Sequence, residues 1–90
     1  MTCWTIEYLA SVRKEVARLD PQARARIREF LEQRLASLED PRSIGEPLKG
    51  SKRGEFWQYR EGDDRVICAI EDRVLRVLVV RIGNRREVFR

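Results

Sequence analysis

Hydrophobic positions along the chain follow two different periods, and the change of period marks the predicted elements. In residues 3–8, apolar and polar side chains alternate, which predicts a half-buried strand. Residues 10–19 place apolar side chains at positions i, i+4 and i+7, and this spacing predicts a short helix. A longer stripe of the same kind predicts a second helix over residues 21–38, with an apolar face formed by Ala23, Ile27, Phe30, Leu31, Leu35 and Leu38.

Two breaks organise the first half of the chain. Aspartate favours the N-cap of a helix and proline favours its first position, so Asp20-Pro21 indicates that the second helix starts directly after the first. Residues 39–54 hold two of the three prolines and three of the five glycines, which predicts a loop. The two helices are therefore expected to form a hairpin with a very short connection.

The second half of the chain predicts strands. Residues 55–60, 65–70 and 74–82 are rich in β-branched and aromatic side chains, and short polar turns separate them, as in a three-stranded antiparallel meander. The last run is the most continuously apolar, which favours an interior strand. The order strand, helix, helix and three strands predicts a single α+β domain over residues 1–90, with the helices packed on one face of the sheet.

Alternation within the strands separates the side chains that face the helices from those on the open face of the sheet. The first group is apolar and contains Trp57, Tyr59, Val66, Cys68 and Ile70. The second group contains Phe56, Gln58, Arg60, Arg65, Ile67 and Ala69. Because Arg60 and Arg65 flank the connecting turn, we expect their guanidinium groups to lie together on the open face, where such groups suit phosphate.

Composition excludes several classes of protein. No run approaches the roughly 20 apolar residues of a membrane span, and the N-terminus lacks the basic and apolar regions of a secretory signal. The sequence has no histidine and no CxxC pair, which excludes the common zinc sites and the histidine-assisted nucleophiles. These features predict a cytoplasmic protein with reduced thiols, without a metal or other cofactor.

Positive charge is concentrated in the C-terminal half. Sixteen of the 19 cations are arginine; residues 1–40 have no net charge, whereas residues 41–90 carry twelve cations and eight anions, a net charge of +4. This distribution predicts a polyanionic partner. The additional phosphate-binding candidates are Lys49, Lys52, Arg53 and Arg86, and Phe56 and Phe89 suit either base stacking or packing. Ordinary surface charge and arginine-rich codon usage explain the same composition and stay open as alternatives.

Four segments together resemble the RelE/ParE toxin superfamily. They are Pro47-Leu48-Lys49-Gly50, Phe56-Trp57-Gln58-Tyr59-Arg60, Gly62-Asp63-Asp64-Arg65-Val66-Ile67 and Arg81-Ile82-Gly83-Asn84-Arg85-Arg86-Glu87-Val88-Phe89. The resemblance implies the toxin of a type II toxin–antitoxin pair. RelE-like members cleave messenger RNA in the ribosomal A site without a metal, whereas ParE-like members inhibit DNA gyrase and are not nucleases. It also implies an acidic, partly disordered antitoxin and contact with operator DNA only through that antitoxin.

The resemblance also suggests catalytic positions. Arg60, Arg65 and Arg85 match family arginines, and Phe89 stands where many RelE-like nucleases carry a tyrosine. Departures from the family pattern occur at Gln58, Asp64, Asn84 and Phe89, and each removes a charge, a titratable group or a hydroxyl.

We therefore expect a ribosome-dependent endonuclease for messenger RNA that forms a 2′,3′-cyclic phosphate and is weakened by Phe89, Asn84 and Gln58. Lys49, Lys52 or Glu55 would transfer the protons. A gyrase-inhibiting toxin and a catalytically degenerate toxin, natural or engineered, remain the alternatives.

Overall fold

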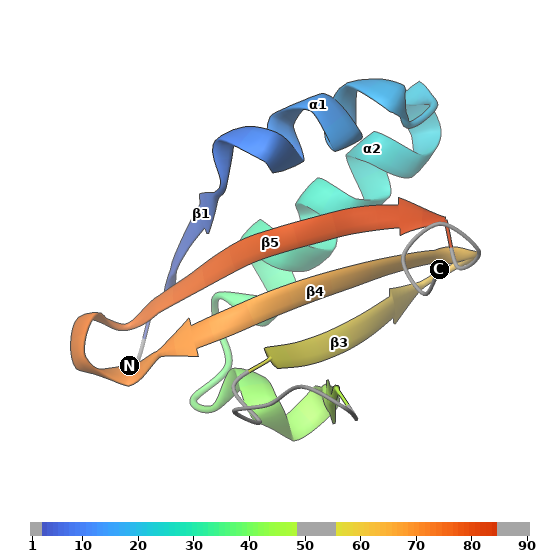
Figure 1. Ribbon diagram of the computed structural model, residues 1–90. Coiled ribbons are helices and arrows are strands. Elements are labelled where there is room, and N and C mark those ends of the chain that lie inside the picture. The colour runs from blue at the N-terminus through green and yellow to red at the C-terminus, as the bar shows by residue number, and fades with distance from the viewer. Residues whose placement is uncertain (1–2, 49–55, 85–90) are drawn as a thin grey trace.

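A mixed sheet carries two helices on one of its faces in the computed structural model, which describes residues 3–48 and 56–84 (Figure 1). The helices are α1 (Ala10–Arg18) and α2 (Pro21–Glu29). The strands are β1 (Thr5–Tyr8), β2 (Glu46–Pro47), β3 (Phe56–Glu61), β4 (Asp64–Glu71) and β5 (Arg76–Asn84). Within this described part, the strands form one sheet in the order β1-β5-β4-β3-β2. The predicted α+β class is confirmed.

The sheet contains the predicted meander and two further pairings. β3, β4 and β5 are antiparallel neighbours, and β5 is an interior strand as expected. β1 adds to the far side of β5 in parallel, with Thr5 opposite Arg76. The short β2 pairs with β3 and lies inside the segment that was expected to be a loop. No helix in the described residues is long and apolar enough to cross a membrane.

The second helix keeps its predicted face but not its predicted geometry. Regular α-helix ends at Glu29, and Phe30–Leu35 continue as a π-helical turn in which the Ala36 amide donates to the Leu31 carbonyl at 3.1 Å. The wider turn admits an extra residue, and its apolar side chains Phe30, Leu31 and Leu35 are all buried. The expectation of a regular helix to residue 38 is therefore wrong beyond Glu29.

The hairpin connection forms as the sequence predicts. Asp20 caps α2, its side chain accepting a hydrogen bond from the Ala23 amide at 2.7 Å, and Pro21 occupies the first turn. The start of the last strand is displaced, because Asp72–Val74 form a 3-10 turn and Leu75 adopts a left-handed conformation with φ of 49°. Val74 and Leu75 are exposed and belong to the turn.

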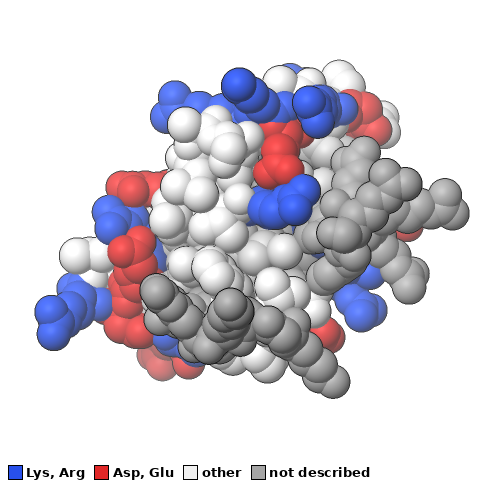
Figure 2. Space-filling view, in the orientation of Figure 1, with Lys and Arg blue, Asp and Glu red and all other residues white. Residues whose placement is uncertain are grey.

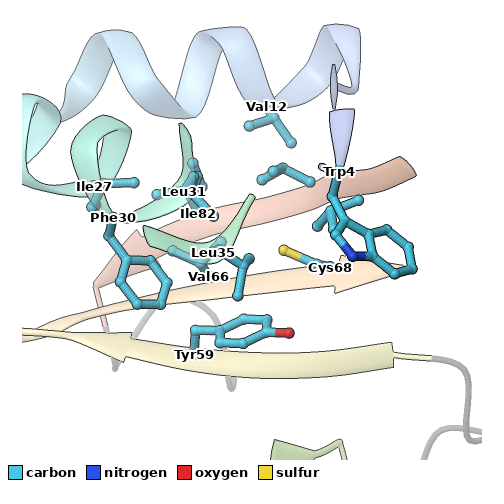
Figure 3. Close-up of a cluster of buried hydrophobic side chains, with 12 residues drawn as sticks. Trp4, Val12, Ile27, Phe30, Leu31, Leu35, Tyr59, Val66, Cys68 and Ile82 are labelled. Atoms are coloured by element: carbon cyan, nitrogen blue, oxygen red, sulfur yellow. The ribbon is translucent and has the colours of Figure 1, made fainter. Parts of the chain in front are cut away.

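The core lies between the sheet and the helices (Figure 3). Leu31, Leu35, Val66 and Cys68 are completely buried there, which confirms the inward-facing set. The buried Tyr59 hydroxyl has a partner, because it donates to the Pro41 carbonyl at 2.8 Å. The Tyr59 ring also packs against Phe30, with ring centroids 5.8 Å apart.

Candidate functional site

Two arginines lie side by side at the β3–β4 hairpin. Gly62, with φ of 62°, allows the tight turn between the strands. The register places Arg60 directly opposite Arg65. Because Tyr59 and Val66 point into the core, the alternation of strand residues turns both arginines to the face that the helices leave uncovered.

The two arginines differ in their exposure to solvent. Arg60 is exposed, whereas Arg65 is only 7% exposed and is the one buried charged side chain among the described residues. Arg65 donates from Nη1 to the Asp64 carbonyl, at a long 3.4 Å. A guanidinium has five N–H donors, and like charges directly opposite each other in a sheet are unfavourable. An anion held between the two groups would relieve both costs.

Two other arginines, Arg76 and Arg42, form ion pairs with carboxylates within the described residues. Arg76, at the other end of β5, donates to Glu71 at 2.8 and 2.9 Å and forms an ion pair with Glu7 at 3.3 Å. Arg42 forms a paired contact with Asp72 at 3.1 and 2.6 Å. In the orientation of Figure 1 much of the visible central surface is uncharged, apart from adjoining basic and acidic side chains near its centre (Figure 2). Arg60 and Arg65 differ from these two arginines because each lies opposite another arginine in the strand register.

The structure brings together only part of the predicted site. Arg60 and Arg65 are adjacent, as described. The other predicted members lie outside the described residues: Lys49, Lys52, Arg53, Glu55, Arg85, Arg86 and Phe89. Their roles remain predictions.

The tyrosine and cysteine of the neighbouring strand positions lie on the core side of the sheet, away from the two arginines. The Tyr59 hydroxyl lies on the opposite, core side of the sheet, and burial raises its pKa above the ordinary range. Burial likewise raises the pKa of the Cys68 thiol. Among the residues placed by the structure, no group of three or more His, Cys, Asp or Glu side chains is arranged to hold a metal.

A groove that the sequence did not predict lies between α1 and α2. This helix groove has a volume of about 230 Å³ and is lined by Tyr8, Arg13, Val16, Leu19, Arg24, Ile27, Arg28 and Ile82. Arg24 donates from Nη2 to the Leu19 carbonyl at 3.1 Å, while its buried Nε has no hydrogen-bond partner within the described chain. In the sequence, the groove corresponds only to apolar residues that lie close to arginines in both helical segments.

The mouth of the groove is fixed by a tyrosine. The Tyr8 hydroxyl donates to Glu32 at 2.9 Å, and Glu32 forms a 3.7 Å ion pair with Arg28. Burial, together with the hydrogen bond to the Glu32 carboxylate, raises the pKa of Tyr8 above its ordinary range. Tyr8 therefore stays protonated and serves as a fixed wall of the groove.

A helical hairpin packed on one face of a mixed sheet is the fold of RelE-like toxins. The family model described as the ParE toxin of type II toxin–antitoxin system, parDE, matches residues 6–89. The chain thus belongs to this family, within the RelE/ParE superfamily, and is a type II toxin. No curated protein matches the sequence significantly.

Solved structures share the fold. The RelBE2 toxin–antitoxin complex of Mycobacterium tuberculosis is similar at 25% identity, with 94% of each chain covered and a TM-score of 0.83. The archaeal RelE–RelB complex of Pyrococcus horikoshii OT3 is 22% identical over 94% of this chain and 97% of that one, with a TM-score of 0.73. Isolated RelE of E. coli is 17% identical over 90% and 83% of the two chains, with a TM-score of 0.69.

Proposed function

We propose that this toxin cleaves messenger RNA on the ribosome, with Arg60 and Arg65 binding the phosphate at the cleaved bond. The observation that carries the proposal is the buried Arg65 directly opposite Arg60. A cation that is removed from water gains strongly from a bound anion, since electrostatic attraction grows as the local dielectric falls. Ribosome and messenger RNA as targets place the activity in the cytoplasm.

The proposed reaction needs no metal or other cofactor. The ribose 2′-hydroxyl loses a proton and attacks the adjacent phosphorus, and the bond from phosphorus to the 5′-oxygen breaks. The products are a 2′,3′-cyclic phosphate and a 5′-hydroxyl, which takes up a proton. Arg60 and Arg65 would stabilise the charge that develops on the phosphate oxygens. Proton transfer falls to groups outside the described residues, for which Lys49, Lys52 and Glu55 remain the candidates.

The test is to add the purified chain to a translation extract and to map RNA ends by primer extension. Cuts inside codons that appear only when ribosomes occupy the message support the proposal. The same RNA without ribosomes is the control. Intact message at toxin concentrations that stop growth in cells would overturn it.

Gyrase inhibition is the second candidate function. One observation favours it: the matching family model is that of ParE toxins. Supercoiling of relaxed plasmid by gyrase, measured with and without the chain, distinguishes the two functions. Blocked supercoiling with intact message selects this alternative.

We further propose that a cognate antitoxin, acidic and partly disordered, docks in the helix groove and links the toxin to operator DNA. Arg13, Arg24 and Arg28 border an apolar floor there, and the unpartnered Nε of Arg24 suits a carboxylate. Arg24→Ala should weaken binding of the product of the neighbouring gene about tenfold, as loss of a charged hydrogen bond does. Arg26→Ala, on the same helix but outside the groove, is the control. Equal binding by both variants would place the antitoxin elsewhere.

A further inference from the structure

A β-bulge in β5 changes the face on which Arg81 lies. Cys68 pairs with Val79, but the next residue of β4, Ile67, pairs with Arg81, so Val80 is an extra residue. Val79 is completely buried in the core, and strict alternation from it would have turned Arg81 inward as well. The bulge instead sends Ile82 into the core and puts Arg81 on the same face as Ile67.

Arg81 thereby joins the arginines of the hairpin. Arg65 lies opposite Gly83, which has no side chain, and Arg81 is two residues before Gly83 on the same face. Such diagonal positions on neighbouring strands are about 7–8 Å apart, within reach of long side chains. Arg60, Arg65 and Arg81 therefore form a row across β3, β4 and β5.

Glu15 of α1 holds this part of β5 in place. β1 stops pairing with β5 at Val79, and no other strand of the described residues pairs with the edge of β5 beyond it. The Glu15 carboxylate fills this position: one oxygen accepts from the Ile82 amide at 3.2 Å, and the other lies 3.5 Å from Nε of Arg81. The Glu15 side chain is 22% exposed and that of Arg81 is 47% exposed. Glu15 thus fixes both the bulged backbone and the guanidinium that the bulge presents.

We infer that Arg81 is a further RNA-binding residue of the proposed site and that Glu15 is its positioning residue. The inference rests on the proposed function, because it assigns both residues to the same RNA-binding face. Arg81 binds a phosphate next to the one held by Arg60 and Arg65. Its ion pair with Glu15 uses the Nε edge, and a guanidinium has further donors on its two terminal nitrogens for an RNA oxygen. Arg81 therefore contributes to binding the message, whereas Arg65 acts on the cleaved bond.

The test is single-turnover cleavage of message on programmed ribosomes, with the toxin concentration varied. Arg81→Ala should raise the half-saturating concentration about tenfold, as loss of one charged hydrogen bond does, and leave the maximal rate within about threefold. Arg73→Ala is the matched control, because it removes the same charge from an exposed turn at the opposite end of β5. Equal effects of the two variants would show that Arg81 supplies only general attraction, and would overturn the inference.

Glu15→Gln separates positioning from net charge. The amide can still accept from the Ile82 N–H, but it no longer pairs with Arg81, and the protein gains one positive charge. Simple attraction to a polyanion would then strengthen binding. We expect instead a severalfold higher half-saturating concentration, since Arg81 is released. Tighter binding would refute the role of Glu15, and absence of cleavage by the unaltered toxin would overturn the proposed function itself.

Discussion

Substitution of Gly45 by alanine tests how firmly the Tyr59 ring is held. The backbone at Gly45 has φ of −105° and ψ of 174°, a conformation open to any residue. A Cβ atom there would lie 2.8 Å from Cε1 and 2.9 Å from Cζ of Tyr59. Gly45 is therefore required for the close approach of the ring and not for its own conformation.

The sign of the effect depends on two opposed terms. Glycine to alanine at a compatible conformation stabilises a protein by about 0.4–1 kcal/mol, through the unfolded chain. Overpacking a closed core costs about 1–3 kcal/mol. Tyr59 is 2% exposed, donates to Pro41 and packs against Phe30, so it has little room to move. We expect a net loss of about 1–2 kcal/mol in the free energy of unfolding.

Thermal unfolding followed by circular dichroism measures this change, and about 1 kcal/mol corresponds to roughly 4–8 °C in a domain of this size. Tyr59→Phe alone should cost about 1 kcal/mol, because the Pro41 carbonyl loses its donor. In that background the ring is free to shift, so Gly45→Ala should cost less than in the unaltered protein. A stabilised Gly45→Ala protein, or fully additive effects, would refute the idea that the hydroxyl contact fixes the ring.

Three further outcomes are expected. Arg65→Ala should lower the maximal rate of ribosome-dependent cleavage about 10²-fold with the fold retained in circular dichroism, and an unchanged rate would reduce Arg65 to a structural role. Phe89→Tyr, outside the described residues, should raise that rate at least tenfold by supplying a hydroxyl for proton transfer, whereas equal rates would show that other groups move the protons. The hydrogen bond from Arg42 lowers the pKa of Asp72, so its stabilisation is present above the ordinary pKa near about 4 and is lost as the pH falls further. Urea unfolding from about pH 6 to about pH 2 should therefore show a smaller acid-induced loss in Asp72→Asn, and an unaltered loss would contradict this.

The fold was predictable where the local sequence pattern alone determines which side chains become buried or capped. Asp20-Pro21 fixes a helix start by local hydrogen bonding alone, and alternation correctly separated Tyr59 and Val66 from Arg60 and Arg65. Pairings between distant segments were not predictable in the same way. The parallel pairing of Thr5 with Arg76 depends on how the helical hairpin packs on the sheet, and no local sequence pattern predicts that packing.

The site was predictable only in part for the same reason. Arg60 and Arg65 flank one turn, so their proximity follows from hairpin geometry. Arg81 escaped notice because the bulge at Val80 breaks the alternation, and a run of apolar residues does not show where an extra residue sits. The link from Arg81 to Glu15 joins segments 66 residues apart and is visible only after folding.

The parallel pairing of β1 with β5 also sets the order in which the protein can fold. β1 can pair only after residues 76–79 of β5 have been synthesised, although β1 itself lies near the start of the chain. Contacts between such distant segments slow folding, because the long connecting chain must be ordered before they form. A nascent chain that stops before β5 lacks the interior strand of the sheet and the edge that receives Glu15. Incomplete synthesis should therefore yield fragments in which the strand that carries Arg81 is missing.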